Sequence, residues 1–114
     1  MKVTDIVLKE MNVFQSDMIL VVEQHPLYEY LNGQKTEKLI GYRYGVIAPY
    51  VGYEKIYVKV VDMMPLFTNG NGLLEKPCKV GFDNFEARFY YSREKKDYLL
   101  TAKADRIFIK KEEQ

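Results

Sequence analysis

Apolar and polar residues alternate with a period of two along much of this chain, which is the repeat of a β-strand. The clearest case is residues 54–62, in which Ile56, Val58 and Val60 fall on one side. Residues 39–48 show the same alternation over ten positions. We predict a strand for each of these segments.

The N-terminal third predicts another strand and a hairpin. Residues 16–24 are apolar on both faces and rich in branched side chains, as is typical of a central strand. We expect this strand to end at His25 and Pro26, because proline removes a backbone donor. Residues 27–31 then alternate into Asn32 and Gly33. An Asn-Gly pair favours a tight hairpin, although a long flexible loop is the alternative.

The C-terminal third predicts the remaining strands. Residues 78–91 form one long alternating segment, with a kink expected at Gly81. A charged turn at residues 92–97 leads into strands at 98–103 and 106–110. The tail from residue 111 is polar, and we expect it to fray.

Two segments are harder to assign. Residues 3–8 suit either a short strand or a helical turn. Residues 63–77 contain two prolines and the sequence Asn69-Gly70-Asn71-Gly72, so we predict one long loop there. Loops of that length are often functional.

Together these elements predict an all-β protein with a single domain over residues 1–114. A chain of 114 residues has room for one core. Five to seven short strands with turns between them are typical of a small barrel or a sandwich. We favour an OB-like β-barrel, because closure removes exposed strand edges. A two-sheet β-sandwich is the alternative.

The composition of the chain limits the classes of function that we expect. Lys plus Arg number 17 and Asp plus Glu 16, a net charge of +1, so no overall field attracts nucleic acid or an anionic membrane. The chain has one cysteine and one histidine, too few for an intrachain disulfide or a Cys/His zinc site. The N-terminus lacks a signal-peptide pattern. We therefore expect a cytoplasmic protein that does not associate with membranes.

Catalytic motifs are absent from the sequence. The Asn-Gly-Asn-Gly segment resembles a phosphate-binding loop, but no Gly-Lys-Ser/Thr follows it, and we expect a flexible loop. We interpret His25 as structural or solvated and Cys78 as a small core residue. The scattered carboxylates of Asp62, Asp83, Glu86 and Asp105 show no metal-binding spacing. We expect neither an enzyme nor a cofactor or metal.

The most informative pattern mixes basic and aromatic residues. Such chemistry binds single-stranded nucleic acid, because aromatic rings stack on bases and cations contact phosphates. The candidate binding residues are Tyr42, Arg43, Tyr44, Tyr57, Lys59, Arg88, Tyr90 and Arg93. The hypothesis requires the tyrosine rings to be exposed. A barrel core also needs aromatics, and Tyr42 and Tyr44 share the face of Val46 and Ala48.

A second hypothesis rests on the segment Met63-Met64-Pro65-Leu66-Phe67. If these side chains are exposed, they form an apolar patch suited to a partner. The protein would then be a protein-interaction or self-assembly module that binds no nucleic acid. The sequence leaves its oligomeric state open.

Several short motifs carry a resemblance over the C-terminal two-thirds of the chain. They are Tyr42-Arg43-Tyr44 and the segments 56–60, 80–84 and 103–107. In these the chain resembles a family of small uncharacterised proteins encoded by conjugative transposons and plasmids of Gram-positive bacteria, whose expected fold is β-rich and OB-like. The chain departs from the family pattern at Arg106, where an acidic residue is usual, and at Pro65, which is displaced.

That resemblance implies an accessory protein of a mobile element. The implied partners are single-stranded DNA or a replication or transfer protein of the element. The resemblance supplies no site residues, so the candidates above come from the basic and aromatic pattern alone.

Overall fold

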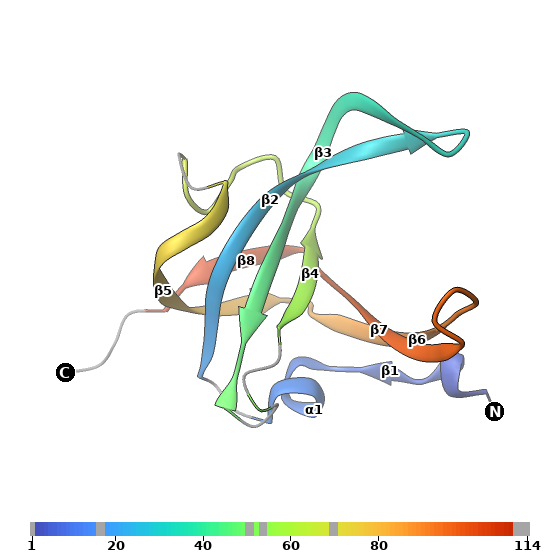
Figure 1. The fold of residues 1–114 in the computed structure, drawn as a ribbon. Helices are drawn as coiled ribbons and strands as arrows, with labels where there is room; N and C mark the ends of the chain where they lie inside the picture. The colour runs from blue at the N-terminus through green and yellow to red at the C-terminus, as the bar shows by residue number, and fades with distance from the viewer. Residues whose placement is uncertain (1, 16–17, 50–51, 53–54, 69–70, 111–114) are drawn as a thin grey trace.

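One mixed β-sheet dominates the computed structural model, which describes the chain except residues 1, 16–17, 50–51, 53–54, 69–70 and 111–114 (Figure 1). A 3-10 helix, η1 (Val3–Asp5), and a short helix, α1 (Glu10–Phe14), accompany the sheet. The strands are β1 (Val7–Leu8), β2 (Ile19–Leu31), β3 (Gln34–Ile47), β4 (Ile56–Val60), β5 (Gly72–Asp83), β6 (Glu86–Ser92), β7 (Asp97–Ala104) and β8 (Arg106–Ile109).

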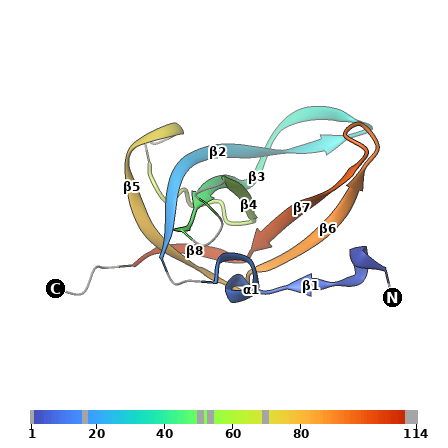
Figure 2. The same cartoon turned by 60° about the horizontal axis from the view of Figure 1, so that its bottom comes forward.

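The strand order is β1-β6-β7-β4-β3-β2-β5-β8. All pairs are antiparallel except β4 with β7, which is parallel. The all-β prediction is confirmed, and the described strands form one sheet rather than the two of a sandwich. The sheet is not closed, because β1 and β8 each have a neighbour on one side only. Figure 2 shows that the strands nevertheless curve around a common interior.

The C-terminal strands form one long bent ribbon. Asp83 of β5 lies opposite Arg106 of β8, and Glu86 of β6 lies opposite Lys103 of β7, so the same register runs through both pairs. The bend falls at Asn84, which takes a positive φ of 54° and whose side-chain amide donates to Asp105 over 2.8 Å. The predicted kink at Gly81 is therefore wrong by three residues.

Gly81 has a packing role instead of a hinge role. A Cβ at this position would lie 2.8 Å from the ring of Phe108 on the paired strand β8. The glycine thus lets the Phe108 ring lie against the β5 backbone. The single strand predicted at residues 78–91 is therefore divided into β5 and β6, and the described residues form eight strands instead of the predicted five to seven.

The β2–β3 hairpin is confirmed, but β2 is longer than predicted. Asn32 and Gly33 form the turn with positive φ values of 51° and 78°, which suits an Asn-Gly pair. The strand does not end at Pro26, since the residue remains paired with Tyr42 of β3. Pairing of β2 with β5 stops at Gln24, so Pro26 lies where β2 has a neighbour on one side only and needs no second donor.

The predicted loop at residues 63–77 is shorter in the structure. β5 begins at Gly72, and Pro77 is accommodated because residues 74–77 are skipped in the pairing with β2, which passes from Leu73 to Cys78. The segment left open at residues 3–8 divides into η1 and β1. The charged turn after β6 is present, and the C-terminal tail lies outside the described residues.

The core lies inside the curved sheet and consists of the inward side chains of the strands together with α1. It contains the predicted inward residues Val46, Val58 and Val60. The Phe14 ring of α1 packs 5.4 Å from the Phe85 ring between β5 and β6. Burying these apolar groups is the main favourable contribution to stability.

Candidate nucleic-acid interface

Three cations lie in a line on the solvent face of the sheet. Arg43 of β3 is directly opposite Lys59 of β4, and Lys59 is directly opposite Lys103 of β7. All three side chains are exposed, and neighbouring strands are about 4.8 Å apart. Like charges in directly opposed positions destabilise a sheet. We call these three residues the cation row.

One end of the cation row is partly balanced by an acid. Glu86 of β6 lies opposite Lys103, with its Oε2 atom 4.0 Å from Lys103 Nζ. Its other oxygen is 3.7 Å from Lys9 Nζ. At the other end, His25 of β2 is opposite Arg43. No acid separates Arg43 from Lys59 or Lys59 from Lys103 in these described pairings.

Tyr57 presents an aromatic ring beside the cation row. Its side chain is 39% exposed. The guanidinium carbon of Arg43 lies 4.7 Å from the ring centroid, and Lys55 Nζ lies 5.9 Å from it. Both contacts are within the range of cation–π attraction. The two cations and the ring therefore form one exposed group on β3 and β4.

A buried carboxylate on β2, on the same face of the sheet, holds Tyr57 and Lys55 in place. Glu23 of β2, only 8% exposed, accepts a hydrogen bond from the Tyr57 hydroxyl over 2.8 Å. Lys55 Nζ is 2.9 Å from the same oxygen, and His25 Nε2 is 3.7 Å from the other. Gly45 makes the space, because a Cβ there would meet Glu23 Oε2 at 2.7 Å.

The pKa values in this cluster follow from its contacts. Burial on its own raises the pKa of Glu23, but the hydrogen bonds from Lys55 and Tyr57 outweigh it and lower the pKa below the ordinary value. The hydrogen bond to Glu23 raises the pKa of Lys55, and the same carboxylate raises the pKa of Tyr57. At neutral pH the cluster therefore holds an ionised carboxylate, an ammonium group and a neutral phenol.

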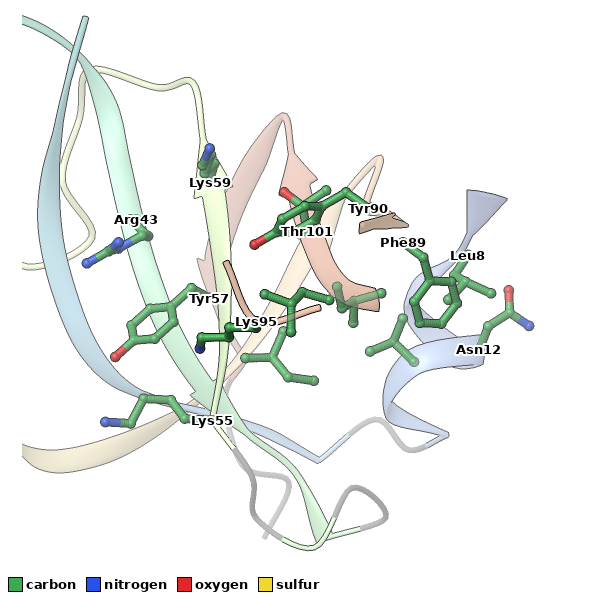
Figure 3. A pocket seen from close by; sticks show the side chains of 14 residues that line it. Leu8, Asn12, Arg43, Lys55, Tyr57, Lys59, Phe89, Tyr90, Lys95 and Thr101 are labelled. Carbon is green, nitrogen blue, oxygen red and sulfur yellow. The ribbon is translucent and has the colours of Figure 1, made fainter. Parts of the chain in front are cut away.

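An open cavity of about 960 Å³ adjoins these residues. Figure 3 shows Arg43, Lys55 and Lys59 on the β3–β4 side of the cavity, with Leu8, Asn12 and Phe89 at the opposite end. The Tyr90 hydroxyl points from β6 toward β4 (Figure 3). The cavity thus brings together side chains from six elements, namely β1, α1, β3, β4, β6 and β7, and from the turn between β6 and β7.

The structure brings four of the eight predicted binding residues together. Arg43, Tyr57, Lys59 and Tyr90 all line the cavity. Arg88 is exposed on β6 and does not line the cavity, but it lies opposite Thr101, which does. Arg93 is exposed in the turn after β6.

Tyr42 and Tyr44 are placed on the other side of the sheet. Tyr44 is 1% exposed, and Tyr42 is half-buried with its ring 6.4 Å from the Tyr44 ring. The Tyr44 hydroxyl accepts a hydrogen bond from the backbone N–H of Leu66 over 3.0 Å, and burial raises its pKa. The Tyr44 ring is therefore part of the core, its hydroxyl holds the segment at Leu66, and the ring is not accessible to a ligand.

Three cations at the site were not among the predicted residues. Lys55 and Lys95 line the cavity, and Lys103 completes the cation row. The charged turn after β6 was visible in the sequence, but its proximity to β4 was not. Lys103 joins the row only through the parallel pairing of β4 with β7, for which the sequence has no local signal.

The other singled-out residues have ordinary surroundings. Cys78 is half-buried against the core, as expected of a small core residue. Asn71 accepts a hydrogen bond from the buried Gln24 amide over 3.0 Å, whereas Asn69 and Gly70 lie outside the described residues. Within the described part of the chain, no three His, Cys, Asp or Glu residues are grouped so as to hold a metal ion.

The apolar segment behind the second hypothesis is divided in two. Met63 and Met64 are exposed, the latter at 75%. Leu66 and Phe67 pack against the core. The Gln24 side chain holds Phe67 in place, accepting from its N–H over 3.0 Å and donating to its carbonyl over 2.8 Å.

Comparisons with models of protein families, with curated proteins and with solved structures found no match. No family membership is shown, and the resemblance to the mobile-element family stays a prediction. Among the helices of the described residues, none has both the length and the apolar character needed to cross a bilayer.

Proposed function

We propose that this protein binds single-stranded DNA without catalysing a reaction on it. The observation that carries the proposal is the cation row of Arg43, Lys59 and Lys103 beside the exposed Tyr57 ring. Three opposed cations cost stability unless an anion neutralises them. A strand of phosphates supplies regularly spaced negative charges, and the adjacent ring supplies a stacking surface.

The fold we propose is an OB-like barrel that is partly open, and the strand path supports it. β2 pairs with β3, β3 with β4, and β4 with β7 in parallel. The bent ribbon of β5–β6 with β7–β8 then leads back to β2 through β5. OB-folds bind oligonucleotides on the face of their second and third strands and with the loop between the last two. Here those parts are β3, β4 and the turn that carries Lys95.

A single strand fits this face better than a duplex. The Tyr57 ring can stack only on a base whose face is free, and bases in a duplex are already stacked. A duplex would offer the cation row phosphates alone. Because the net charge is only +1, the phosphate contribution is limited to local contacts, and we expect moderate affinity that is strongest at low salt.

The decisive experiment is fluorescence anisotropy with a labelled single strand of about 20 bases, longer than the roughly 4–16 nucleotides that one OB-fold covers. Binding is titrated at several salt concentrations and repeated with the matching duplex. We expect saturable binding that prefers the single strand and weakens with salt. Lys103→Gln should weaken it, while Lys76→Gln, at an exposed lysine of β5 outside the row and the cavity, should not. Equal binding of the duplex, or no binding at low salt, would overturn the proposal.

One observation favours a protein-interaction module as the second candidate. Val61, Met63 and Met64 are exposed within four residues after β4, and exposed apolar side chains that gather together often mark a contact surface. If this is the main function, light scattering across a range of concentrations will show self-association that Met64→Ser abolishes. A monomer at every concentration would exclude self-assembly.

A further inference from the structure

The cavity beside the cation row exists because the pairing of β4 with β7 is short. The parallel register joins Val58 to Ala102 and Val60 to Ala104. Toward the N-terminal side of that register the two strands line the cavity instead, with Ile56 on β4 and Leu99 and Leu100 on β7. The cavity is therefore a gap between adjoining strands of the sheet, with the cation row at its edge.

The lining divides into two chemical parts. The walls are apolar and come from Leu8, Val13, Ile56, Phe89, Leu99 and Leu100. Asn12, Tyr90 and Thr101 add neutral hydrogen-bonding groups. The charged lining residues are all cations, and no carboxylate is among the described residues that line the cavity. Figure 3 shows the Phe89 end apart from the cations of β3 and β4.

We propose that this cavity receives one unstacked nucleobase of the bound strand, an inference that rests on the proposed function. An apolar wall with a few neutral donors and acceptors suits a base, which is flat, uncharged and polar at its edge. The cations at the mouth suit the phosphates on either side of that base. Ligand cavities measure about 300–1,000 Å³, so a volume of about 960 Å³ has room for a base and its sugar.

The charge pattern favours a nucleotide over an aliphatic anion. An acyl chain would use the apolar wall and one cation, and would offer no hydrogen bond to the Thr101 hydroxyl or the Tyr90 hydroxyl at the cavity. The polar edge of a base can hydrogen-bond to hydroxyl groups of this kind. Of the four cations that line the cavity, Lys55 is paired with Glu23. The other three, Arg43, Lys59 and Lys95, are more than one carboxylate requires and suit consecutive phosphates.

The test is an NMR titration of the full chain with methyl-labelled Ile, Leu and Val. The probes are hexathymidylate, the same phosphodiester strand without bases, and decanoate. We expect hexathymidylate to shift the methyl signals of Ile56, Leu99 and Leu100, and the abasic strand to shift only the signals near the cation row. If both strands shift the same signals, the base does not enter the cavity, although the protein still binds the strand. If neither strand binds, the proposed function fails as well.

A variant that obstructs the cavity gives an independent measurement. Thr101 is exposed at the lip of the cavity, so the indole of Thr101→Trp should occupy part of the cavity and obstruct its entrance without disturbing the core. Tyr98→Trp on the same strand, outside the cavity, is the matched control. We expect Thr101→Trp to weaken hexathymidylate binding about tenfold, the scale of losing one base contact, while the salt dependence stays unchanged. Unchanged affinity in a folded Thr101→Trp protein, or methyl shifts with decanoate alone, would overturn the inference.

Discussion

The Tyr57 hydroxyl donates a 2.8 Å hydrogen bond to Glu23 Oε2, and the two residues are separated in the sheet by Gly45 alone. Gly45 pairs with Glu23 on one side and with Tyr57 on the other. The missing side chain lets the carboxylate pass over β3 to reach the phenol. A side chain of β2 thereby sets the position of the ring that we propose to contact DNA.

This relationship predicts that Gly45→Ala is destabilising. The new Cβ would meet Glu23 Oε2 at 2.7 Å, so the carboxylate must move and lose its bond to Tyr57. We expect a loss of about 1–3 kcal/mol in the free energy of unfolding, the usual cost of overpacking. Urea denaturation measures it. In a Glu23→Ala background the same substitution should cost much less, and an equal cost in both backgrounds would contradict the steric explanation.

The placement of Glu23 also predicts how stability depends on pH. Its pKa is lowered in the folded protein from the ordinary value of 4.5, so the unfolded chain takes up the proton first as the pH falls. The contribution of Glu23 to stability is therefore present above about pH 4.5 and is lost as the pH falls through the lowered pKa. Urea unfolding as a function of pH should show this loss in the wild type and not in Glu23→Gln.

The matched control for that measurement is Glu37→Gln, at an exposed position of β3, which should leave the acid dependence of stability as it is in the wild type.

At alkaline pH the dependence of stability on pH has the opposite sign. The pKa values of Lys55 and Tyr57 are raised from 10.5 and 10.0, so their contribution is present below about pH 10 and is lost as the pH rises further. Stability that rises on acidification below pH 4.5 would contradict the assignment.

Much of the fold could be predicted from local patterns, and the exceptions have physical causes. Some features depend only on residues close together in the sequence and can be predicted from it. Examples are the alternation at Val58 and Val60 and the turn at Asn32-Gly33. The predicted strand end at Pro26 is wrong, because the effect of a proline depends on whether a second strand lies alongside, which the local sequence does not show. Glycine permits a bend, and the sequence therefore predicts one at Gly81, whereas the structure bends at Asn84, whose side-chain amide donates a hydrogen bond to Asp105.

The same distinction applies to the candidate site. Arg43, Tyr57 and Lys59 could be predicted because alternation puts them on the outer face of their strands. Tyr44 lies on the inner face of the same pattern, and its burial follows from the same rule. Lys103 could not be predicted, because β7 reaches β4 only through a parallel pairing between segments far apart in the chain.

Tyr44 and Tyr57 predict opposite outcomes for a matched pair of substitutions. Tyr44→Phe removes the acceptor of the Leu66 N–H and should cost about 1 kcal/mol of stability, with no effect on binding of a single strand. Tyr57→Ala removes the exposed ring and should weaken binding about tenfold. Anisotropy and urea denaturation on both variants test this. Weakened binding in Tyr44→Phe without weakening in Tyr57→Ala would contradict the assignment of Tyr57 as the stacking ring.

The cation row predicts that stability and binding change in opposite directions. Lys59→Glu places a carboxylate between Arg43 and Lys103, converting two repulsive cross-strand pairs into attractive ones. Each pair contributes about 0.2–1 kcal/mol, so we expect the free energy of unfolding to rise at low salt. The same change should abolish binding of the oligonucleotide, because a negative charge then faces the phosphates.

Lys76→Glu is the control for Lys59→Glu, since it makes the same change of charge at an exposed position outside the row. Lys76→Glu should change both the free energy of unfolding and the affinity for the oligonucleotide less than Lys59→Glu does. Urea unfolding at low and high salt separates the electrostatic gain from other effects, because screening should remove it. A folded Lys59→Glu protein that is less stable at low salt would show that the row is not under repulsion. The main structural reason for proposing an anionic ligand would then be lost.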